Sequence, residues 1–382
     1  MAAKIGLQKT LDEVRKVPYT VSVGTFTAVV RERCNSGGSK TMNQVLTFGE
    51  MLMRLKTPGY SRILQADSFE AAFGGAEMNV AVSLAQFGDA VGCVTKLPQN
   101  PLGDAARNTL RRYGVDTSRV LRGGPRLGIY FFEKGTDIRP TNVVYDRAGS
   151  AFATAQRSEF DWPALLEGVR CFYFSGITAA VSPELTGALE DALACCKKRK
   201  IPVVCDLNYR GKMWTPQQAQ PVMDRLMQYV TVCLANDEDF EASLGIRAFD
   251  GDMSRGIEQK EQFCEGMREI TKRYPSCTTV ASVLRNIHSV EDSEWMGILL
   301  QNGTFTETAV RKIHVMEGVG GGDAFGAGLM HGLLHEKKPQ EVIDFALAAS
   351  VLKLMIGGDL NLSTEAEVEA VMKKGAGAKL SR

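Results

Sequence analysis

Short apolar runs alternate with longer amphipathic segments through the middle of the chain. The runs at residues 171–175, 203–205 and 231–234 have the length and composition of buried strands. Between them, the segments near 184–199 and 216–228 repeat apolar residues at helical spacing. Strands that alternate with helices in this way form a parallel sheet with helices on both faces. The pattern therefore predicts an α/β fold.

The same kind of pattern occurs nearer the N-terminus. An apolar run at residues 45–49 ends in glycine and predicts a first buried strand. Residues 77–87 have helical spacing, and Gly88 is a suitable stop. Residues 91–97 predict a further strand and residues 104–113 a helix. These elements extend the predicted sheet by two strands.

Other segments predict antiparallel pairs and two closing helices. Residues 129–133 and 142–146 are rich in β-forming residues and flank a polar stretch with glycine and proline, so they predict an antiparallel pair. Residues 299–309 predict a second hairpin. Helical patterns at 323–335 and 339–355 complete the chain.

Four polar or glycine-rich clusters fall at the ends of predicted strands. They occupy residues 74–75, 206–210, 236–239 and 320–323. In open α/β sheets, ligands bind outside the carboxyl ends of the strands. Four clusters at successive strand ends therefore predict one shared site.

The last cluster carries the strongest chemical signal. Gly320, Gly321 and Gly322 run directly into Asp323 and a predicted helix. Consecutive glycines let backbone N–H groups turn toward one point, and a helix N-terminus attracts anions. An anion cradle beside a carboxylate base suits phosphoryl transfer to a hydroxyl. The alternative is an ordinary loop in which Asp323 is an N-cap, because aspartate is favoured there.

Composition limits the classes of function. The 382 residues are 44% hydrophobic, which allows a large core. Lys plus Arg number 45 against 44 Asp plus Glu, so no strong net charge favours nucleic acid or an anionic membrane. No segment reaches the ~18 apolar residues of a membrane span. Nine cysteines without a CxxC pair indicate a reduced, cytoplasmic protein.

Two histidines are spaced for a shared contact on a helix. His331 and His335 are four residues apart, a spacing that can bind a metal. No HExxH motif accompanies them, so we interpret them as histidines on a helix surface.

The N-terminal part of the chain differs from the rest. Residues 1–41 lack a continuous apolar segment and make a poor signal peptide, and residues 34–40 have the composition of a linker. Met42 precedes the first convincing strand. We expect residues 1–41 to be an extension that is either not native or poorly ordered, and residues 42–382 to form the folded domain.

Taken together, the motifs resemble those of the ribokinase-like sugar kinases, the phosphofructokinase-B family. The anchors of this resemblance are residues 74–79 and 320–325. Residues 145–151, 174–178 and 206–210 are further similar to the subgroup of 2-keto-3-deoxygluconate kinases. The resemblance covers the chain from about residue 45 to the C-terminus.

The resemblance implies a three-layer α/β/α sandwich with a small β-sheet lid. The lid strands would come from about residues 52–70 and 128–147, and such lids often pair into homodimers or higher homo-oligomers. The implied reaction is ATP- and Mg²⁺-dependent phosphorylation of the terminal hydroxyl of 2-keto-3-deoxygluconate to 2-keto-3-deoxy-6-phosphogluconate. The alternatives are a fructokinase or ribokinase-like enzyme, or a catalytically silent regulatory sugar-binding protein.

The resemblance also assigns roles to residues. Asp323 would be the catalytic base and Gly320, Gly321 and Gly322 the anion hole. The substrate side would comprise Gly74, Gly75, Asn79, Tyr130, Tyr145, Arg147, Arg210 and Asp359. The nucleotide side would comprise Asn208, Asn236, Arg285, Gly320 and Gly322, and Mg²⁺ would be held through water by Asn236, Glu238 and Asp239.

Each of these roles has a structural alternative. Arg147 and Arg210 can pair with a substrate carboxylate in a fork, or form surface salt bridges. Tyr130 can donate a hydrogen bond, or pack in a sheet. Glycines 74–75 and Asp359 can shape turns, Asn79 can be structural, and residues 236–239 can be a solvated helix start.

The chain departs from the family pattern at three places. The family has Asp-Thr-Thr before the glycines, where this chain has Glu317-Gly318-Val319. A nucleotide-side lysine is absent from residues 284–289, where Arg285 stands instead. The Asn-x-x-Glu element ends in Asp239. These departures concern nucleotide contacts more than the base or the anion cradle.

Overall fold

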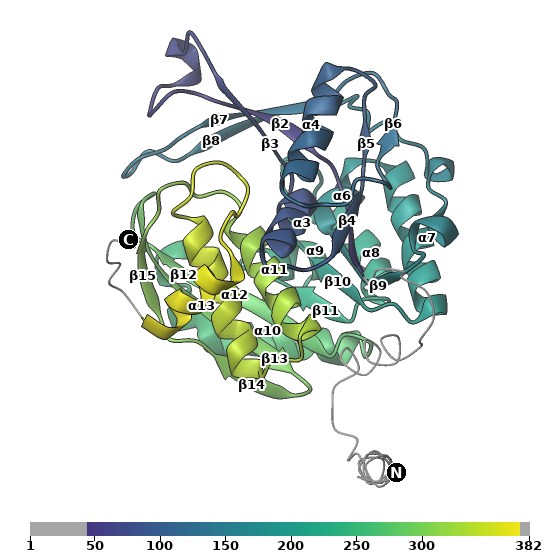
Figure 1. The fold of residues 1–382 in the computed structure, drawn as a ribbon. Coiled ribbons are helices and arrows are strands. Elements are labelled where there is room, and N and C mark those ends of the chain that lie inside the picture. The colour runs from purple at the N-terminus through teal and green to yellow at the C-terminus, as the bar shows by residue number, and fades with distance from the viewer. Residues whose placement is uncertain (1–43, 375–382) are drawn as a thin grey trace, which may run out of the picture.

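The computed structural model describes residues 44–374 (Figure 1). The expected extension at residues 1–41 lies outside the described residues. The main sheet has nine strands. Across it lie β14 (Thr304–Glu307), β13 (Asp292–Gln301), β12 (Thr279–Ile287), β11 (Val232–Leu234), β10 (Val203–Asp206), β9 (Val169–Ser175), β1 (Gln44–Phe48) and β4 (Val91–Val94), and β15 (Arg311–His314) pairs with β13.

The strands from β12 to β4 run parallel, whereas β13, β14 and β15 form an antiparallel edge. The parallel order of β1, β4, β9, β10 and β11 confirms the arrangement predicted from the alternation of apolar runs and helices. The hairpin predicted at residues 299–309 is confirmed by the pairing of β13 with β14.

Side chains of the sheet alternate between two hydrophobic cores. Phe172 and Phe174 of β9 lie in one core, and Cys171 and Tyr173 lie in the other. The first core is covered by α5 (Trp162–Leu165), α6 (Gly176–Val181), α7 (Pro183–Arg199), α8 (Pro216–Met227), α9 (Asp239–Leu244) and α10 (Lys260–Arg273). The second is covered by α3 (Ala76–Gln86), α4 (Pro101–Arg112), α11 (Gly321–Leu334), α12 (Pro339–Lys353) and α13 (Glu365–Lys374). The three-layer sandwich is therefore confirmed.

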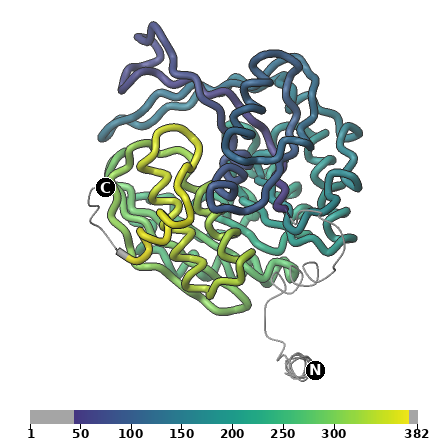
Figure 2. Tube along the Cα trace, viewed as in Figure 1, coloured from purple at the N-terminus to yellow at the C-terminus, as the bar shows by residue number. Residues whose placement is uncertain are grey.

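A second sheet of four strands projects from the body, as Figure 1 shows. Its order is β3 (Glu70–Gly74), β2 (Leu52–Lys56), β7 (Gly128–Glu133) and β8 (Asn142–Asp146). The antiparallel pairing of β7 with β8 is the predicted one. The purple and blue strands of this lid lie next to the yellow C-terminal segment in Figure 2.

Several predicted boundaries need correction. The helix expected at 104–113 begins at Pro101, and the helix expected at 339–355 ends at Lys353. The strand expected at residues 91–97 is divided, because Lys96–Leu97 (β5) leaves the main sheet and pairs with Leu121–Arg122 (β6). The helix expected at 323–335 begins two residues earlier, at Gly321, because Gly320 is its N-cap. Short 3₁₀ turns lie at Ile63–Gln65, Arg157–Glu159, Met253–Arg255 and Ile257–Gln259. Among the described helices, none has the length and apolar character needed to cross a membrane.

Candidate active site

A cleft of about 680 Å³ lies between the lid and the carboxyl ends of the parallel strands. The polar clusters that follow successive strands all contribute to its lining, as expected for an open α/β sheet. Of the residues to which the sequence assigned a role in this site, Gly74 alone does not line the cleft. Those that do are Gly75, Asn79, Tyr130, Tyr145, Arg147, Asn208, Arg210, Asn236, Glu238, Asp239, Arg285, Gly320, Gly321, Gly322, Asp323 and Asp359.

The glycine turn before α11 depends on the absence of side chains. Gly320 has φ 74°, in the left-handed region, and a Cβ there would lie 2.3 Å from the carbonyl oxygen of Asp359. At Gly322 a Cβ would meet no atom within 4 Å, so this face of the helix start is open. The first amides of α11 have no partner within the helix and carry the positive end of its dipole. This end of α11 is therefore suited to bind an anion.

Asp323 is the third residue of α11 and is not its N-cap, which excludes the capping alternative. Its carboxyl is buried and accepts a hydrogen bond from Nδ2 of Asn79 at 2.7 Å. Burial raises the pKa of Asp323 to about 6, against the opposing effects of Asn79 and Arg210. A carboxylate with this pKa is a better proton acceptor near neutral pH than an ordinary aspartate.

Asn79 connects this carboxyl to the lid. Its Oδ1 accepts a hydrogen bond from the backbone N–H of Gly75 at 3.2 Å, while its Nδ2 donates to Asp323. A Cβ on Gly75 would lie 2.0 Å from the carbonyl oxygen of Glu50, and one on Gly74 would lie 2.6 Å from the side chain of Asp359. The two glycines therefore allow β3 to pack closely against the base of the cleft.

A buried ionic cluster lies under the lid. Arg54 of β2 is 1% exposed, donates to Oδ2 of Asp359 at 2.9 Å and forms an ion pair with Glu317. The hydroxyl of Tyr130 donates to the other oxygen of Asp359, and burial raises the pKa of Tyr130. Asp359 is thus engaged by two groups of the lid, one cationic and one neutral.

Sequence reasoning missed Arg54 and gave Glu317 no role. Arg54 and the buried Leu52 are two residues apart on β2, so their side chains lie on the same, inward face of the strand. A charged residue at an inward-facing position was the sequence signal that could have identified Arg54. Glu317 also accepts from Nζ of Lys56 at 2.7 Å and from the N–H of Gly358 at 2.9 Å. Glu317 stands in the segment that replaces the Asp-Thr-Thr of the family pattern, and it links strand β2 of the lid to the turn at Gly358.

The two candidate carboxylate-binding arginines differ in availability. Arg147 is ion-paired with Glu50, and its Nε donates to Oε2 of Glu50 at 2.8 Å. Its guanidinium carbon lies 5.9 Å from the centre of the Tyr145 ring. Arg210 donates to the carbonyl oxygen of Tyr209 at 2.8 Å and has no ion pair with a described carboxylate. Arg210 is therefore the more available cation for an acidic ligand.

Asp206 is a second residue that sequence reasoning left without a role. It is 4% exposed, and its Oδ1 has no hydrogen-bond partner among the described residues. Burial, followed by the charges of Asp239 and Asp323, raises its pKa well above the usual value. Asn208, which has φ 40°, donates to its other oxygen at 3.4 Å. An unpartnered buried carboxyl oxygen among other carboxyls fits a hydrated divalent cation.

The proposed magnesium residues have backbone contacts that fix their positions. Asp239 accepts from the N–H of Tyr209 at 2.7 Å and from the N–H of Asn236 at 3.0 Å, and burial raises its pKa to about 6. Oδ1 of Asn236 accepts from the N–H of Val283 at 2.8 Å. Glu238 is exposed. Asp239 and Asn236 therefore have fewer free lone pairs than Asp206, which favours contacts through water.

Arg285 lines the cleft, and a second cation, Lys353, is buried beneath the glycine turn. Arg285 of β12 is ion-paired with Asp237, lies 5.4 Å from the Trp295 ring centre, and has its pKa lowered by burial to about 10. Lys353 lies beneath the glycine turn, where burial lowers its pKa to about 8 and its Nζ donates to the carbonyl oxygen of Ile356 at 3.0 Å. Sequence reasoning named Arg285 but missed Lys353, the last residue of α12, which follows a run of mostly apolar residues.

The fold and the cleft together define a protein that transfers an anionic group to a hydroxyl. The family model of the pfkB carbohydrate kinases matches residues 42–364, and the chain belongs to this family. The prediction of a ribokinase-like sugar kinase is thereby confirmed.

Similar proteins cover nearly all of the described chain. This chain is 32% identical over 337 residues to the 2-dehydro-3-deoxygalactonokinase of Haloferax volcanii, and the match covers 87% of this chain and 97% of that protein. A crystal structure of the 2-dehydro-3-deoxygluconokinase of Thermotoga maritima is 44% identical with a TM-score of 0.82, covering 86% and 99% of the two chains. A structure from Escherichia coli described as ribokinase II with ATP and Mg²⁺ is 13% identical with a TM-score of 0.72, covering 87% and 100%, and shares the fold.

Proposed function

We propose that the protein transfers the γ-phosphoryl group of ATP to the terminal hydroxyl of 2-keto-3-deoxygluconate, which forms 2-keto-3-deoxy-6-phosphogluconate. The observation that carries this proposal is the buried Asp323 carboxyl at the glycine-lined start of α11. The names of the similar proteins support an acidic 3-deoxy sugar as the acceptor.

The chemistry follows from this arrangement. Asp323 accepts the proton of the acceptor hydroxyl as its oxygen attacks the γ-phosphorus. The bond from that phosphorus to the bridging oxygen breaks, and ADP leaves. The amides at Gly320, Gly321 and Gly322 donate to the transferring phosphoryl oxygens, and each such contact is worth ~10²–10³ in rate.

For the nucleotide and Mg²⁺ we keep the residues assigned from the sequence, and we add Asp206 to the residues near the metal. Asn208, Asn236 and Arg285 would contact the nucleotide together with the glycine turn. Asn236, Glu238 and Asp239 would hold Mg²⁺ through water, close to the unpartnered Oδ1 of Asp206. When bound, Mg²⁺ neutralises charge on the phosphate oxygens.

The acidic end of the sugar would meet Arg210 and Arg147, with Tyr145, Tyr130, Asn79 and Asp359 arranged along the remaining wall. We expect Arg210→Ala to raise KM for 2-keto-3-deoxygluconate about 10–100-fold with little change in kcat, because a charge-assisted pair with the substrate is lost. Arg147→Ala is expected to act more weakly, since Glu50 already pairs with Arg147. Steady-state kinetics on the sugar acid and on fructose checks this, and equal effects on both sugars would contradict carboxylate recognition.

The pH profile provides a test of the base. Because the pKa of Asp323 is raised to about 6, kcat/KM should fall about tenfold per unit as the pH drops below that value. The sign follows from the requirement that the carboxyl be ionised to accept the proton. Initial rates between about pH 5 and pH 8 check this, and a flat acidic limb would contradict the assignment.

Substrate identity is decided by a coupled assay of ADP release. The panel comprises 2-keto-3-deoxygluconate, its galacto epimer, fructose and ribose, each at several concentrations. The proposal expects the highest kcat/KM for an acidic 3-deoxy sugar. A preference for fructose or ribose would favour the other sugar-kinase alternative, and no sugar-dependent ADP release would favour a regulatory binding protein.

We also propose that the lid forms a homodimer or higher homo-oligomer, as the family resemblance implies. β8 is an edge strand of the lid, and Val144 and Tyr145 on it are 46% and 41% exposed. Unpaired edge strands with apolar side chains are prone to associate. Light scattering should give a mass of at least two chains that Val144→Lys lowers, and a monomer at all concentrations would contradict this.

The described cysteines are all free thiols, which fits the proposed cytoplasmic location.

A further inference from the structure

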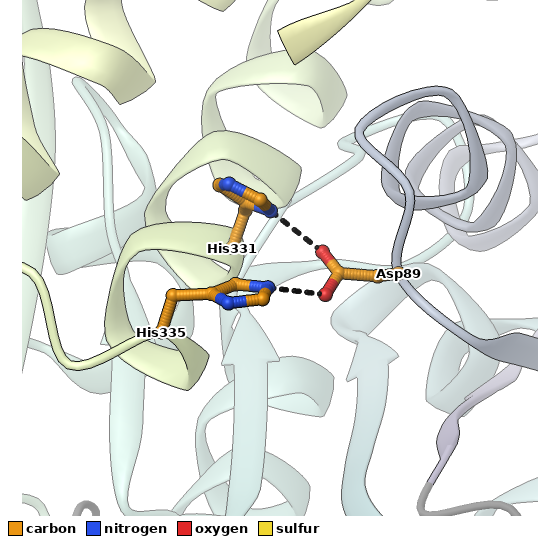
Figure 3. A group of neighbouring side chains, drawn as sticks. All are labelled: Asp89, His331 and His335. Atoms are coloured by element: carbon orange, nitrogen blue, oxygen red, sulfur yellow. Dashed lines mark hydrogen bonds and ion pairs between the residues drawn. The ribbon is translucent and has the colours of Figure 1, made fainter.

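Two histidines and an aspartate meet at the end of α11 that is remote from the glycine turn (Figure 3). Nδ1 of His331 lies 2.8 Å from Oδ2 of Asp89, and Nε2 of His335 lies 2.9 Å from Oδ1 of the same carboxyl. The three side chains present one nitrogen or oxygen each within 4.8 Å of one another. This is the geometry of a small three-residue chelating group.

The interpretation of both histidines as surface residues is wrong for His331. Its side chain is 1% exposed, whereas that of His335 is 48% exposed. The reason is that α11 packs against both α3 and α12, so a large part of its circumference is buried. Residues four apart on such a helix face the same direction, here toward the turn after α3 that carries Asp89.

The hydrogen bonds of His331 exceed what a neutral imidazole can supply. Its Nδ1 faces Asp89, and its Nε2 lies 3.2 Å from Oε1 of Glu365 in α13. A neutral imidazole has one N–H donor, yet both neighbours are carboxylates that accept. One of the two contacts therefore requires either a second proton or a cation between nitrogen and oxygen.

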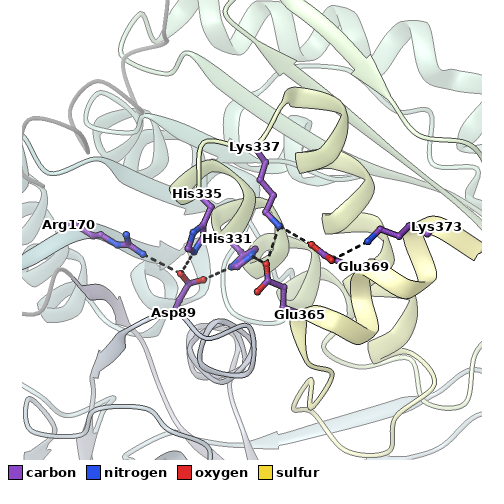
Figure 4. Close-up of polar contacts among 8 residues, drawn as sticks. All are labelled: Asp89, Arg170, His331, His335, Lys337, Glu365, Glu369 and Lys373. Atoms are coloured by element: carbon purple, nitrogen blue, oxygen red, sulfur yellow. Dashed lines mark hydrogen bonds and ion pairs between the residues drawn. The ribbon is translucent and has the colours of Figure 1, made fainter. Parts of the chain in front are cut away.

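Two cationic side chains lie beside this cluster. Arg170 contributes an ion pair at 3.3 Å to Oδ1, and Lys337 lies 3.1 Å from Glu365, as Figure 4 shows. A carboxylate and two imidazoles form a set of hard and borderline ligands that suits zinc.

We propose that Asp89, His331 and His335 bind one divalent transition-metal ion, with Zn²⁺ as the best match. The ligand atoms would be a carboxylate oxygen of Asp89, Nδ1 of His331 and Nε2 of His335. Zinc–ligand bonds of ~2.0–2.2 Å at tetrahedral angles place ligand atoms roughly 3.3 Å apart, so small side-chain movements suffice. Solvent reaches the half-exposed His335, which allows entry of the ion and a water as fourth ligand.

Glu365 contacts the second ring nitrogen of His331, which supports this assignment. Metal-ligating histidines usually donate their second ring N–H to a carboxylate, which fixes the ring orientation. Oε1 of Glu365 lies 3.2 Å from Nε2 of His331, the nitrogen that would not bind the ion. With the ion in place of the proton on Nδ1, both ring nitrogens of His331 have suitable partners.

The site would stabilise the fold and would not take part in phosphoryl transfer. The 14 residues of α11 span roughly 20 Å, which separates the histidines from the glycine turn. The ion would join the end of α11 to the turn after α3, and through Glu365 to α13. Binding to the folded chain alone raises its stability by mass action.

Calorimetric titration of chelator-treated full-length protein with ZnCl₂ tests this proposal, at about pH 7.5 where histidine is largely neutral. We expect one ion per chain and a higher melting temperature. His335→Gln should weaken binding at least ~10-fold, and Glu365→Gln about 10–100-fold. The matched control is His314→Gln, because His314 forms an exposed pair with Asp292 at 2.9 Å outside the cluster and should leave binding unchanged.

Co²⁺ provides a second, spectroscopic measurement. A tetrahedral nitrogen and oxygen site should give visible absorption that Zn²⁺ abolishes and that is absent in His335→Gln. The proposal is overturned if the wild-type protein shows no saturable Zn²⁺ binding, or if His314→Gln weakens binding as much as His335→Gln. Stabilisation of the protein by lower pH but not by Zn²⁺ would also overturn it, because the cluster would then be held together by protonated histidines and carboxylates without a metal ion.

Discussion

Replacing Asp323 with asparagine is expected to lower kcat about 10²–10⁴-fold, the range lost when a general base is removed. The side chain keeps its shape, and its amide oxygen can still accept the hydrogen bond from Asn79. Folding and sugar binding should therefore remain close to wild type. Single-turnover ADP formation, a sugar-binding titration and thermal unfolding measure the three properties separately.

The matched control is Asp104→Asn, because Asp104 also lies in the first turn of a helix, α4, but outside the cleft. It should retain normal turnover. Near-normal turnover of Asp323→Asn, or an equal loss in the control, would contradict the role of Asp323 as base.

Replacing Arg54 with methionine is expected to destabilise the protein by about 3–5 kcal/mol, the usual loss when one partner of a buried ion pair is removed. The change leaves Asp359 and Glu317 buried with one cationic partner fewer. The methionine also lacks the guanidinium that lies 4.2 Å from the Phe132 ring centre. Urea unfolding at fixed protein concentration measures this loss.

Lys56→Met is the control for this change, because Lys56 lies on the same strand and also pairs with Glu317, but its side chain is 20% exposed. Its loss should be markedly smaller than that of Arg54→Met. Equal destabilisation by the two variants would contradict the assignment of Arg54 as the central cation of the lid cluster.

The sandwich could be predicted from the sequence because its strands are continuous apolar runs. The strand runs near 171–175 and 203–205 are buried on both faces and therefore read as uninterrupted hydrophobic stretches. The long β12 and the amphipathic α10 lie between residues 235 and 298, where no elements were predicted. In α10, Phe263, Met267 and Ile270 have helical spacing, so the signal was present but diluted by charged residues.

The glycine-lined end of the cleft could also be located from the sequence, because glycines and an aspartate at the start of a helix have a local chemical meaning. The lid cluster could not be predicted. Arg54 and Glu317 are 263 residues apart, and Arg54 and Asp359 are 305 apart. Local patterns do not show which distant charges become partners. Likewise, the burial of His331 depends on α3 and α12 packing against α11.

A crystal structure of the protein with 2-keto-3-deoxygluconate and a non-hydrolysable ATP analogue is the most direct test of the central claim. The measured quantity is the distance from the carboxyl of Asp323 to the terminal hydroxyl oxygen of the sugar. We predict a hydrogen bond of about 2.6–3.2 Å, with the γ-phosphate at the amides of Gly320, Gly321 and Gly322. With the lid closed over both ligands, an acceptor oxygen well beyond that reach of Asp323 would contradict the account.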